Sequence, residues 1–311
     1  MIEASESVAL PKNLPENLPE AAAGLTEETS IAIAQQIQWT DISLPFGTVS
    51  TSYICQGQGM PVVLLHGFDS SLFEFRRLVP LLAKHCQVWS LDLMGFGFCG
   101  RGNASSRTTT DRVDPEAIKQ HLHAFFQQMI GEPVVLVGAS MGGGVAIDFV
   151  TSYPEMVTQL VLIDAVGFAA GPAVGKVMFP PLDKWATNFL RSPGVRRKIS
   201  EKAYYDKAFV TPDAEVCAAL HLRVPGWQQA LITFTKSGGY NFLSKRIGEV
   251  AVPTLVLWGR QDKILGTKDA ARFEKVIDRC KLIWIEACGH VPHLEKATEC
   301  AEHITAFLSL G

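Results

Sequence analysis

The chain has no hydrophobic run long enough to cross a bilayer. A spanning helix needs about 20 consecutive apolar residues, and no stretch of the 311 residues approaches that length. The first thirty residues also lack the basic start and continuous apolar stretch of a secretory signal, because Lys12 is their only basic residue and three prolines interrupt them. We therefore expect neither an integral membrane segment nor export.

An excess of one charge is also missing. The 28 basic and 31 acidic residues give a formal net charge of -3. Such a balance provides no broad attraction for a polyanion. We therefore expect no nucleic-acid partner.

The cysteines lack a pairing pattern. There are seven, an odd number, and none forms a CxxC motif. Disulfide frameworks and zinc sites have regular spacings that are absent here. We interpret the cysteines as free thiols in a reducing compartment, and expect the protein to be cytoplasmic. Cys288, close to a candidate base, is interpreted as buried and structural.

Metal-ligand spacing is absent too. His293 and His303 lie near His290, but no carboxylate or cysteine completes a recognisable ligand set. We expect solvent-facing or capping roles for His293 and His303, with no metal and no cofactor.

What the sequence does contain is an alternation of short β-rich runs with longer helical patterns. The strands are predicted at residues 62–65, 88–91, 134–137, 160–163, 254–258 and 281–285, and the helices at 72–84, 115–129, 141–151, about 268–276 and 292–308. This order predicts a mostly parallel sheet with crossover helices, and the continuous apolar strands indicate helices on both faces. Residues 38–54, interrupted at 45–47, predict an antiparallel hairpin at the start of the sheet.

The alternation stops between residues 166 and 250, where aromatic and large apolar residues mix with charge. We predict a helical cap over 166–250, inserted into an α/β core formed by 36–165 and 251–311. Residues 1–35 are predicted to be a flexible or surface-draped arm, because its prolines remove backbone donors and restrict their neighbours. A short helix from about residue 26 to 36 ends this arm.

A candidate nucleophile lies in Gly138-Ala139-Ser140-Met141-Gly142. This segment follows an apolar strand and precedes a helix. A nucleophile elbow needs this order, because the serine sits on a strained turn and small neighbours allow strand and helix to approach. Ser140 is therefore the predicted nucleophile.

The acid and base that a serine nucleophile requires follow later in the chain. Asp262 comes just after the strand 254–258, and His290 just after 281–285. The carboxyl ends of parallel strands form the edge at which ligands bind. Asp164, directly after 160–163, is a rival acid, and we expect it instead to bond nearby backbone amides.

The loop after residues 62–65 is the candidate oxyanion loop. The backbone N–H groups of Phe68 and Met141 are the predicted donors to the oxyanion, and His66 is expected to shape the loop. Asp69, next in this loop, is left outside the predicted site. Asp92 is expected to order the turn after its own strand.

Three motifs together resemble those of the α/β-hydrolase fold serine hydrolases. These are His66-Gly67-Phe68, the 138–142 elbow, and Gly289-His290 after Asp262. The resemblance runs from about residue 38 to the C-terminus and is to esterase-like and lipase-like members with a helical cap. In one further turn of the family, Cys99 stands where serine is usual.

The resemblance implies hydrolysis of a small-molecule carboxylic ester with an apolar acyl or alcohol part, through an acyl-enzyme and without a cofactor. Two alternatives stay open. One is a carbon-carbon bond hydrolase with the same triad, and the other is a noncatalytic protein that binds a small ligand. The sequence leaves open a peripheral membrane contact through the cap, and specifies neither the chain length of the ester nor the oligomeric state.

Overall fold

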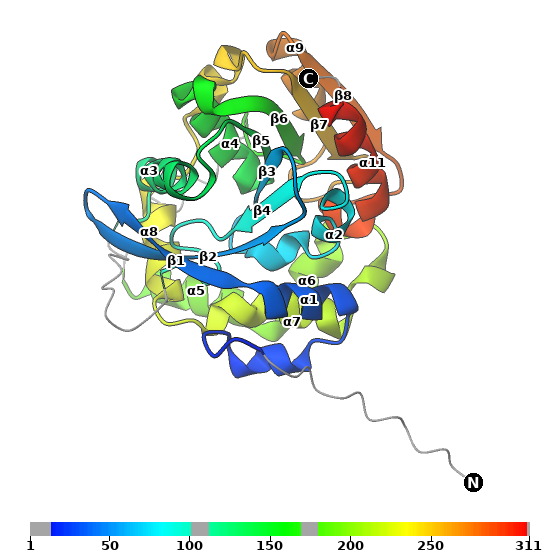
Figure 1. Ribbon diagram of the computed structural model, residues 1–311. Helices are drawn as coiled ribbons and strands as arrows, with labels where there is room; N and C mark the ends of the chain where they lie inside the picture. Colours follow the sequence, from blue (N-terminus) through cyan, green and yellow to red (C-terminus); the bar gives the residue numbers. More distant parts are fainter. Residues whose placement is uncertain (1–13, 101–111, 169–179, 310–311) are drawn as a thin grey trace.

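An eight-stranded sheet forms the centre of the molecule (Figure 1). The structure is a computed structural model that describes residues 14–100, 112–168 and 180–309. The strand order is β1-β2-β4-β3-β5-β6-β7-β8. The pairs β1/β2 and β2/β4 are antiparallel, and all later neighbours are parallel. The predicted α/β-hydrolase fold, with an antiparallel hairpin leading into a parallel sheet, is confirmed.

The strands are β1 (Gln38–Leu44), β2 (Gly47–Gln56), β3 (Pro61–Leu65), β4 (Gln87–Leu91), β5 (Val134–Ala139), β6 (Val157–Ile163), β7 (Thr254–Gly259) and β8 (Cys280–Ile285). The core helices are α1 (Glu28–Gln36), α2 (Val79–Leu82), α3 (Pro115–Phe125), α4 (Met141–Ser152), α9 (Ala270–Val276), α10 (Pro292–Glu295) and α11 (Ala297–Leu308).

Both faces of the sheet are buried, because successive side chains of a strand point to opposite faces. Val63 and Leu65 belong to the hydrophobic cluster that includes residues of α3, α4 and α9. Val62 and Leu64 belong to the second cluster, with residues of α1, α2 and α11. Helices on both faces explain why the central strands read as continuous apolar runs.

Two predicted helices are shorter than expected. Residues 72–84 form a 3-10 turn, η2 (Leu72–Phe75), and the short helix α2. Pro80 lacks an N–H donor and lies in the first turn of α2, where that donor is not needed. The predicted helix 292–308 is divided into α10 and α11 at Lys296, whose φ and ψ are -130° and 45°.

Residues 14–36 pack against the core, which corrects the prediction of a flexible arm for this part; residues 1–13 lie outside the described residues. Leu25 and Ile33 are fully buried. Asp213 caps α1 from a distant helix, since its carboxylate accepts the N–H groups of Thr26 (2.6 Å) and Glu27 (2.9 Å) and the Ser30 hydroxyl (2.5 Å). Because Asp213 lies far from α1 in the sequence, the local sequence pattern did not reveal these hydrogen bonds.

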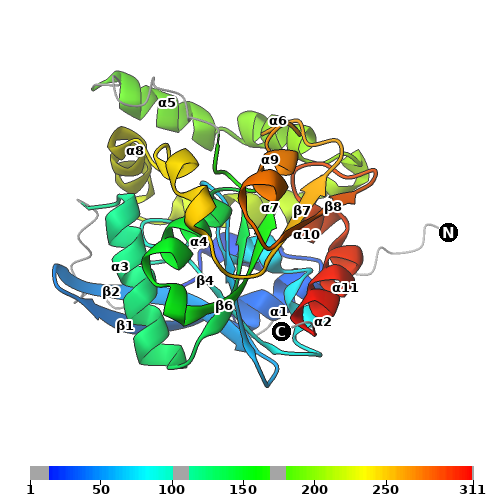
Figure 2. The ribbon, with the colours of Figure 1, turned by 90° about the horizontal axis from the view of Figure 1, so that it is seen from above.

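Between β6 and β7, the described residues of the insertion form helices and no strand. These helices are α5 (Leu182–Arg191), α6 (Pro193–Ala203), α7 (Pro212–Ala219) and α8 (Trp227–Ser237). In Figure 2, α5 and α6 lie on the outer side of the molecule, away from the strands. We call this insertion the cap. Among the described helices, none has the length and apolar character needed to span a membrane.

We predict that Asp213→Ala lowers the free energy of unfolding by about 1–3 kcal/mol, because it leaves the N–H groups of Thr26 and Glu27 and the Ser30 hydroxyl without their acceptor. Urea unfolding measures this loss. Limited proteolysis is expected to cut first within residues 14–36. The exposed Asp278→Ala is the matched control, and equal stability of the two variants would contradict the role of Asp213.

Candidate active site

Ser140 lies on a strained turn between β5 and α4. Its φ of 51° and ψ of -116° are unusual for a residue with a side chain. The turn is tight because a Cβ on Gly138 would lie 2.3 Å from the carbonyl oxygen of Gly142, and one on Gly142 would lie 2.0 Å from that of Leu65. Only glycine fits at these two positions. The serine is thereby held at the carboxyl edge of the sheet.

The structure brings Ser140, His290 and Asp262 into one hydrogen-bonded chain. The Ser140 hydroxyl is 3.0 Å from His290 Nε2, and His290 Nδ1 is 2.9 Å from Asp262 Oδ2. The other carboxylate oxygen of Asp262 accepts the N–H groups of Ile264 (2.6 Å) and Leu265 (3.1 Å). Burial alone would raise the pKa of Asp262, but the hydrogen bond to His290 and its charge lower it below the usual value.

Asp164, the rival acid, lies beside the Ser140–His290–Asp262 hydrogen bonds, and its own partner is the backbone of Gly259. Its carboxylate accepts the backbone N–H of Gly259 at 3.1 Å, as expected of a residue that bonds backbone amides. Burial, and then the neighbouring Asp262, raise the pKa of Asp164 well above its usual value. Asp164 is therefore harder to ionise than a free carboxyl group, whereas Asp262 is easier to ionise.

Donor atoms of Asp164, Asp262 and His290 lie within 4.8 Å of one another, a spacing that could hold a cation. Each of these side chains already has a hydrogen-bond partner in the arrangement just described. Hydrogen bonding therefore accounts for the geometry of all three groups.

The loop after β3 approaches Ser140 closely. A Cβ on Gly67 would lie 3.3 Å from the Cβ of Ser140. Within the part of the chain that the structure describes, the backbone N–H groups of Phe68 and Met141 have no acceptor. His66 shapes this loop as predicted, because its Nδ1 lies 2.8 Å from the Gly67 carbonyl and its Nε2 accepts the N–H of Leu93 at 3.0 Å.

Asp92 orders the turn after β4, as expected. Its carboxylate accepts the Ser52 hydroxyl (2.5 Å) and the N–H groups of Leu72 (2.7 Å) and Phe98 (2.8 Å). These bonds join β2, the start of η2 and the turn after β4 around one buried group.

A buried Glu74–His293 pair supports the loop from below. Gly67 N–H donates to Glu74 Oε2 at 2.9 Å, and His293 Nε2 lies 3.1 Å from Glu74 Oε1. Burial opposes ionisation of Glu74, but the hydrogen bond and charge of His293 lower its pKa to about 2. The expectation that His293 faces solvent or caps a helix is wrong, because its side chain is only 1% exposed. His303 is half-buried on α11.

Asp69 connects the oxyanion loop to three parts of the cap, although the sequence prediction left it outside the site. Its carboxylate accepts Arg196 Nη1 at 2.6 Å and the Trp227 indole N–H at 2.7 Å, and it lies 3.1 Å from His221 Nε2. Burial opposes ionisation, yet these partners hold the pKa of Asp69 below its usual value. These partners lie 127 to 158 positions along the chain, so no local pattern announces them.

Glu295 forms a second connection between site and cap. Its carboxylate accepts the N–H groups of Gly289 (2.9 Å), Tyr205 (3.0 Å) and Asp206 (2.6 Å). The N–H of His290 itself donates to the carbonyl of Ala203 in the cap at 2.7 Å. Cys288 is fully buried and burial raises the pKa of its thiol, in agreement with the predicted structural role.

A cavity of about 290 Å³ lies between core and cap and reaches Ser140 and His290. Phe68 and Asp69 line it from the core, and α6 contributes Ile199. Arg76, only 2% exposed, adds a cation to the wall. The cavity is mainly apolar. Two guanidinium groups, those of Arg76 and Arg196, are among the polar groups that line it.

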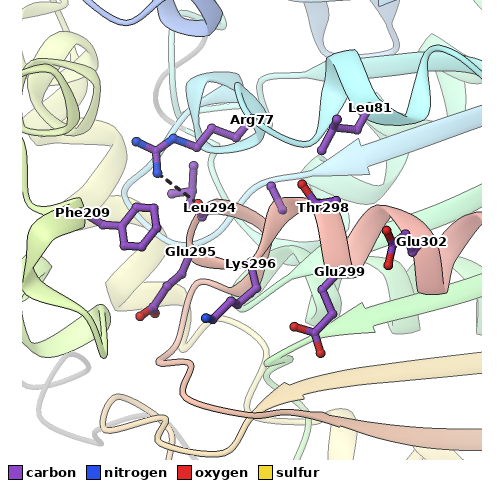
Figure 3. A pocket seen from close by; sticks show the side chains of 10 residues that line it. Arg77, Leu81, Phe209, Leu294, Glu295, Lys296, Thr298, Glu299 and Glu302 are labelled. Carbon is purple, nitrogen blue, oxygen red and sulfur yellow. Dashed lines mark hydrogen bonds between the residues drawn. The ribbon is translucent and has the colours of Figure 1, made fainter.

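An open hollow of about 610 Å³ lies elsewhere and contains none of the predicted site residues (Figure 3). Figure 3 shows Arg77 bonded to the carbonyl of Leu294, at 3.1 Å, with Phe209 of the cap nearby. Arg77 also pairs with Glu27 at 2.7 Å and lies over the Phe209 ring at 4.9 Å. Arg77 thereby connects the N-terminal segment, the cap and α10.

Comparison with known proteins agrees with this geometry. The profile of the Alpha/beta hydrolase family matches residues 62–303, and the chain belongs to that family. It is 30% identical over 305 residues to the alpha/beta hydrolase domain-containing protein VTE7 of Arabidopsis thaliana, covering 95% of this chain and 90% of the relative.

Other relatives include a dienoic acid hydrolase and a lipase. A 2-hydroxy-6-oxo-6-(2'-aminophenyl)hexa-2,4-dienoic acid hydrolase of Metapseudomonas resinovorans is 28% identical, over 85% of this chain and 89% of the relative. Lipase 1 of Psychrobacter immobilis is also 28% identical, over 81% of this chain and 78% of the relative. A solved serine hydrolase involved in carbazole degradation matches with a TM-score of 0.71 and 25% identity, over 88% of this chain and 100% of that one. The family therefore contains both lipases and hydrolases of dienoic acids.

We predict that Glu74→Gln destabilises the protein most above about pH 5. A carboxylate whose pKa falls from 4.5 to about 2 on folding stabilises the folded state above pH 4.5, and this contribution is lost as the pH falls towards 2. The difference in unfolding free energy between variant and wild type should therefore shrink below pH 4.5. Urea unfolding from pH 7 to 3.5 tests this, with the exposed Glu132→Gln as control. A difference that stays constant with pH would contradict the buried ion pair.

Proposed function

We propose that the protein hydrolyses a carboxylic ester with an apolar acyl or alcohol part. The observation that carries this proposal is the chain of hydrogen bonds from Ser140 through His290 to Asp262 at the wall of a mainly apolar cavity. His290 takes the proton of the Ser140 hydroxyl as the serine attacks the ester carbonyl. It then returns this proton to the leaving alcohol, which forms an acyl-enzyme.

The remaining groups have parts in the same reaction. Asp262 holds the proton of His290 on Nδ1 and stabilises the imidazolium. The N–H groups of Phe68 and Met141 donate to the developing oxyanion, a contribution typically worth about 10²- to 10³-fold in turnover. Water, activated by His290, then attacks the acyl-enzyme and releases the acid. The relative Lipase 1 supports an ester substrate.

Carbon-carbon bond hydrolysis is the second candidate, and Arg76 is the observation that favours it. Its buried guanidinium lines the cavity. Its Nε lies 3.9 Å from Glu27 Oε2, and in the described part of the chain neither Nε nor Nη2 has a hydrogen-bond partner. A guanidinium of this kind suits a substrate carboxylate, and the relative from Metapseudomonas resinovorans acts on a dienoic acid. Assays with nitrophenyl esters and with a 2-hydroxy-6-oxo-dienoate, run in parallel, separate the two reactions. Turnover of the dienoate alone would overturn the ester proposal.

We expect Ser140→Ala to lower kcat for a nitrophenyl ester by at least about 10⁴-fold, because the nucleophile is lost. A fluorophosphonate probe should label the wild type and the exposed Ser43→Ala control, but not Ser140→Ala. A folded wild-type protein that neither reacts with the probe nor hydrolyses either substrate class would indicate a ligand-binding protein without catalysis.

Replacement by asparagine should affect the two buried acids, Asp262 and Asp164, differently. Asp262→Asn is expected to lower kcat/KM by about 10³- to 10⁴-fold, because the amide cannot hold His290 in the required tautomer. Asp164→Asn should change kcat/KM by less than about 10-fold, because the amide oxygen can still accept the Gly259 N–H that the Asp164 carboxyl accepts. Steady-state kinetics on folded variants decides this, with Asp278→Asn as control. The reverse order of effects would make Asp164 the catalytic acid.

A further inference from the structure

Helix α5 is amphipathic in the opposite sense to an ordinary surface helix. Its polar Asp183 and Thr187 are only 3% and 4% exposed, whereas the apolar side chains of Leu182, Trp185 and Phe189 are 51%, 69% and 55% exposed. The rings of Trp185 and Phe189 stack on each other at the surface, 6.1 Å apart. Exposed apolar side chains gathered on one face generally mark an interaction site. Figure 2 shows α5 at the outer side of the cap.

Hydrogen bonds to α8 hold α5 in this orientation. Lys236 Nζ donates to Asp183 Oδ2 at 2.6 Å, and Gln228 Nε2 donates to Thr187 Oγ1 at 2.7 Å. Turning the apolar face inward would break both contacts and carry Asp183 away from Lys236. The hydrogen bonds to α8 therefore fix the apolar face of α5 towards the outside of the cap.

Basic residues are frequent in the part of the cap that carries this face. Residues 180–207 contain seven basic and three acidic residues, in a chain with a net charge of -3. Lys184 is exposed beside Trp185, and Lys198 and Lys202 line a groove together with Phe189. Within residues 14–100, 112–168 and 180–309, no carboxylate pairs with any of these three lysines. The surroundings of the apolar face thus attract anions.

The groove leads towards the candidate active site. It has a volume of about 610 Å³ and lies between α5, α6 and the loop that follows β7. Ile199 and Ile264 line both this groove and the cavity that reaches Ser140. The groove and the cavity that reaches Ser140 therefore adjoin each other at these two apolar side chains.

We propose that the face formed by Leu182, Trp185 and Phe189, with the lysines around it, docks on a lipid bilayer that carries anionic headgroups. Aromatic side chains are favoured at membrane–water interfaces, and lysines beside them add attraction to anionic lipids. The bilayer delivers an apolar ester through the groove. This delivery rests on the proposed function, whereas the docking itself does not depend on the reaction.

Co-sedimentation of the full chain with vesicles tests the docking. Wild type should bind phosphatidylcholine vesicles that contain phosphatidylglycerol, and Trp185→Ser/Phe189→Ser should bind them at least about 10-fold more weakly. Lys184→Gln/Lys198→Gln/Lys202→Gln should lose binding to the anionic vesicles and show little change on pure phosphatidylcholine. Met60→Ser/Val276→Ser removes two exposed apolar side chains elsewhere and should bind like the wild type. No binding by wild type, or equal binding by the Trp185/Phe189 variant, would overturn the proposal.

Two further measurements identify other occupants of the face. If a second copy of the chain covers it, sedimentation will show a dimer that Trp185→Ser/Phe189→Ser dissociates, without an effect on vesicles. If part of the same chain covers it, this variant will melt at a lower temperature than the control. Either result, without weaker vesicle binding, overturns the docking proposal.

The test also separates docking from catalysis. Hydrolysis of a short, soluble ester should be equal in the wild type and Trp185→Ser, whose side chain lines neither the groove nor the cavity, whereas hydrolysis of a long-chain ester held in anionic vesicles should fall in Trp185→Ser by about the same factor as its binding. Vesicle binding by Ser140→Ala at the wild-type level supports a surface that is independent of the reaction. A protein that binds vesicles and hydrolyses no ester would leave the docking intact and overturn the proposed function.

Discussion

The contact between the first turn of α4 and strand β3 determines how the candidate site is built. Gly142 brings the helix against the Leu65 carbonyl, at a distance where no side chain fits. This contact forces the chain through the positive φ of Ser140 and places the serine beside the loop of Gly67 and Phe68. The candidate nucleophile and both candidate oxyanion donors thus depend on one packing constraint. Backbone strain of this kind persists where the surrounding structure over-determines it.

The cap is joined to the site by two carboxylates rather than by apolar packing alone. Asp69 holds α6, the segment with His221 and the start of α8 to the oxyanion loop, and Glu295 holds the end of α6 to the loop of His290. Both are nearly fully buried. Charge-assisted hydrogen bonds at low dielectric are strong and directional. The position of the cap is therefore coupled to the two loops on which the proposed chemistry depends.

The sequence predicted the positions of the core strands along the chain, their mostly parallel arrangement, the antiparallel hairpin and the three residues of the hydrogen-bonded chain. These follow from local signals: apolar runs, glycine positions, and polar residues directly after strands. Asp69, Glu74 and Glu295 were missed because their roles arise from partners in other parts of the chain. The prediction for His293 was wrong for the same reason, since its partner Glu74 lies far from it in the sequence. The inverted polarity of α5 escaped notice too, because no residue pattern says which face of a helix its neighbours will cover.

The position of the cap between β6 and β7 has a consequence for synthesis of the chain on the ribosome. Ser140 and its loop belong to strands that are made first, whereas Asp262 and His290 follow the last two strands, β7 and β8, which add to the sheet beyond β6. A nascent chain that ends within the cap can contain β1 to β6 while His290 has not yet been made. The Ser140 hydroxyl gains its hydrogen-bond partner only after β7, β8 and the loop with His290 have followed the cap.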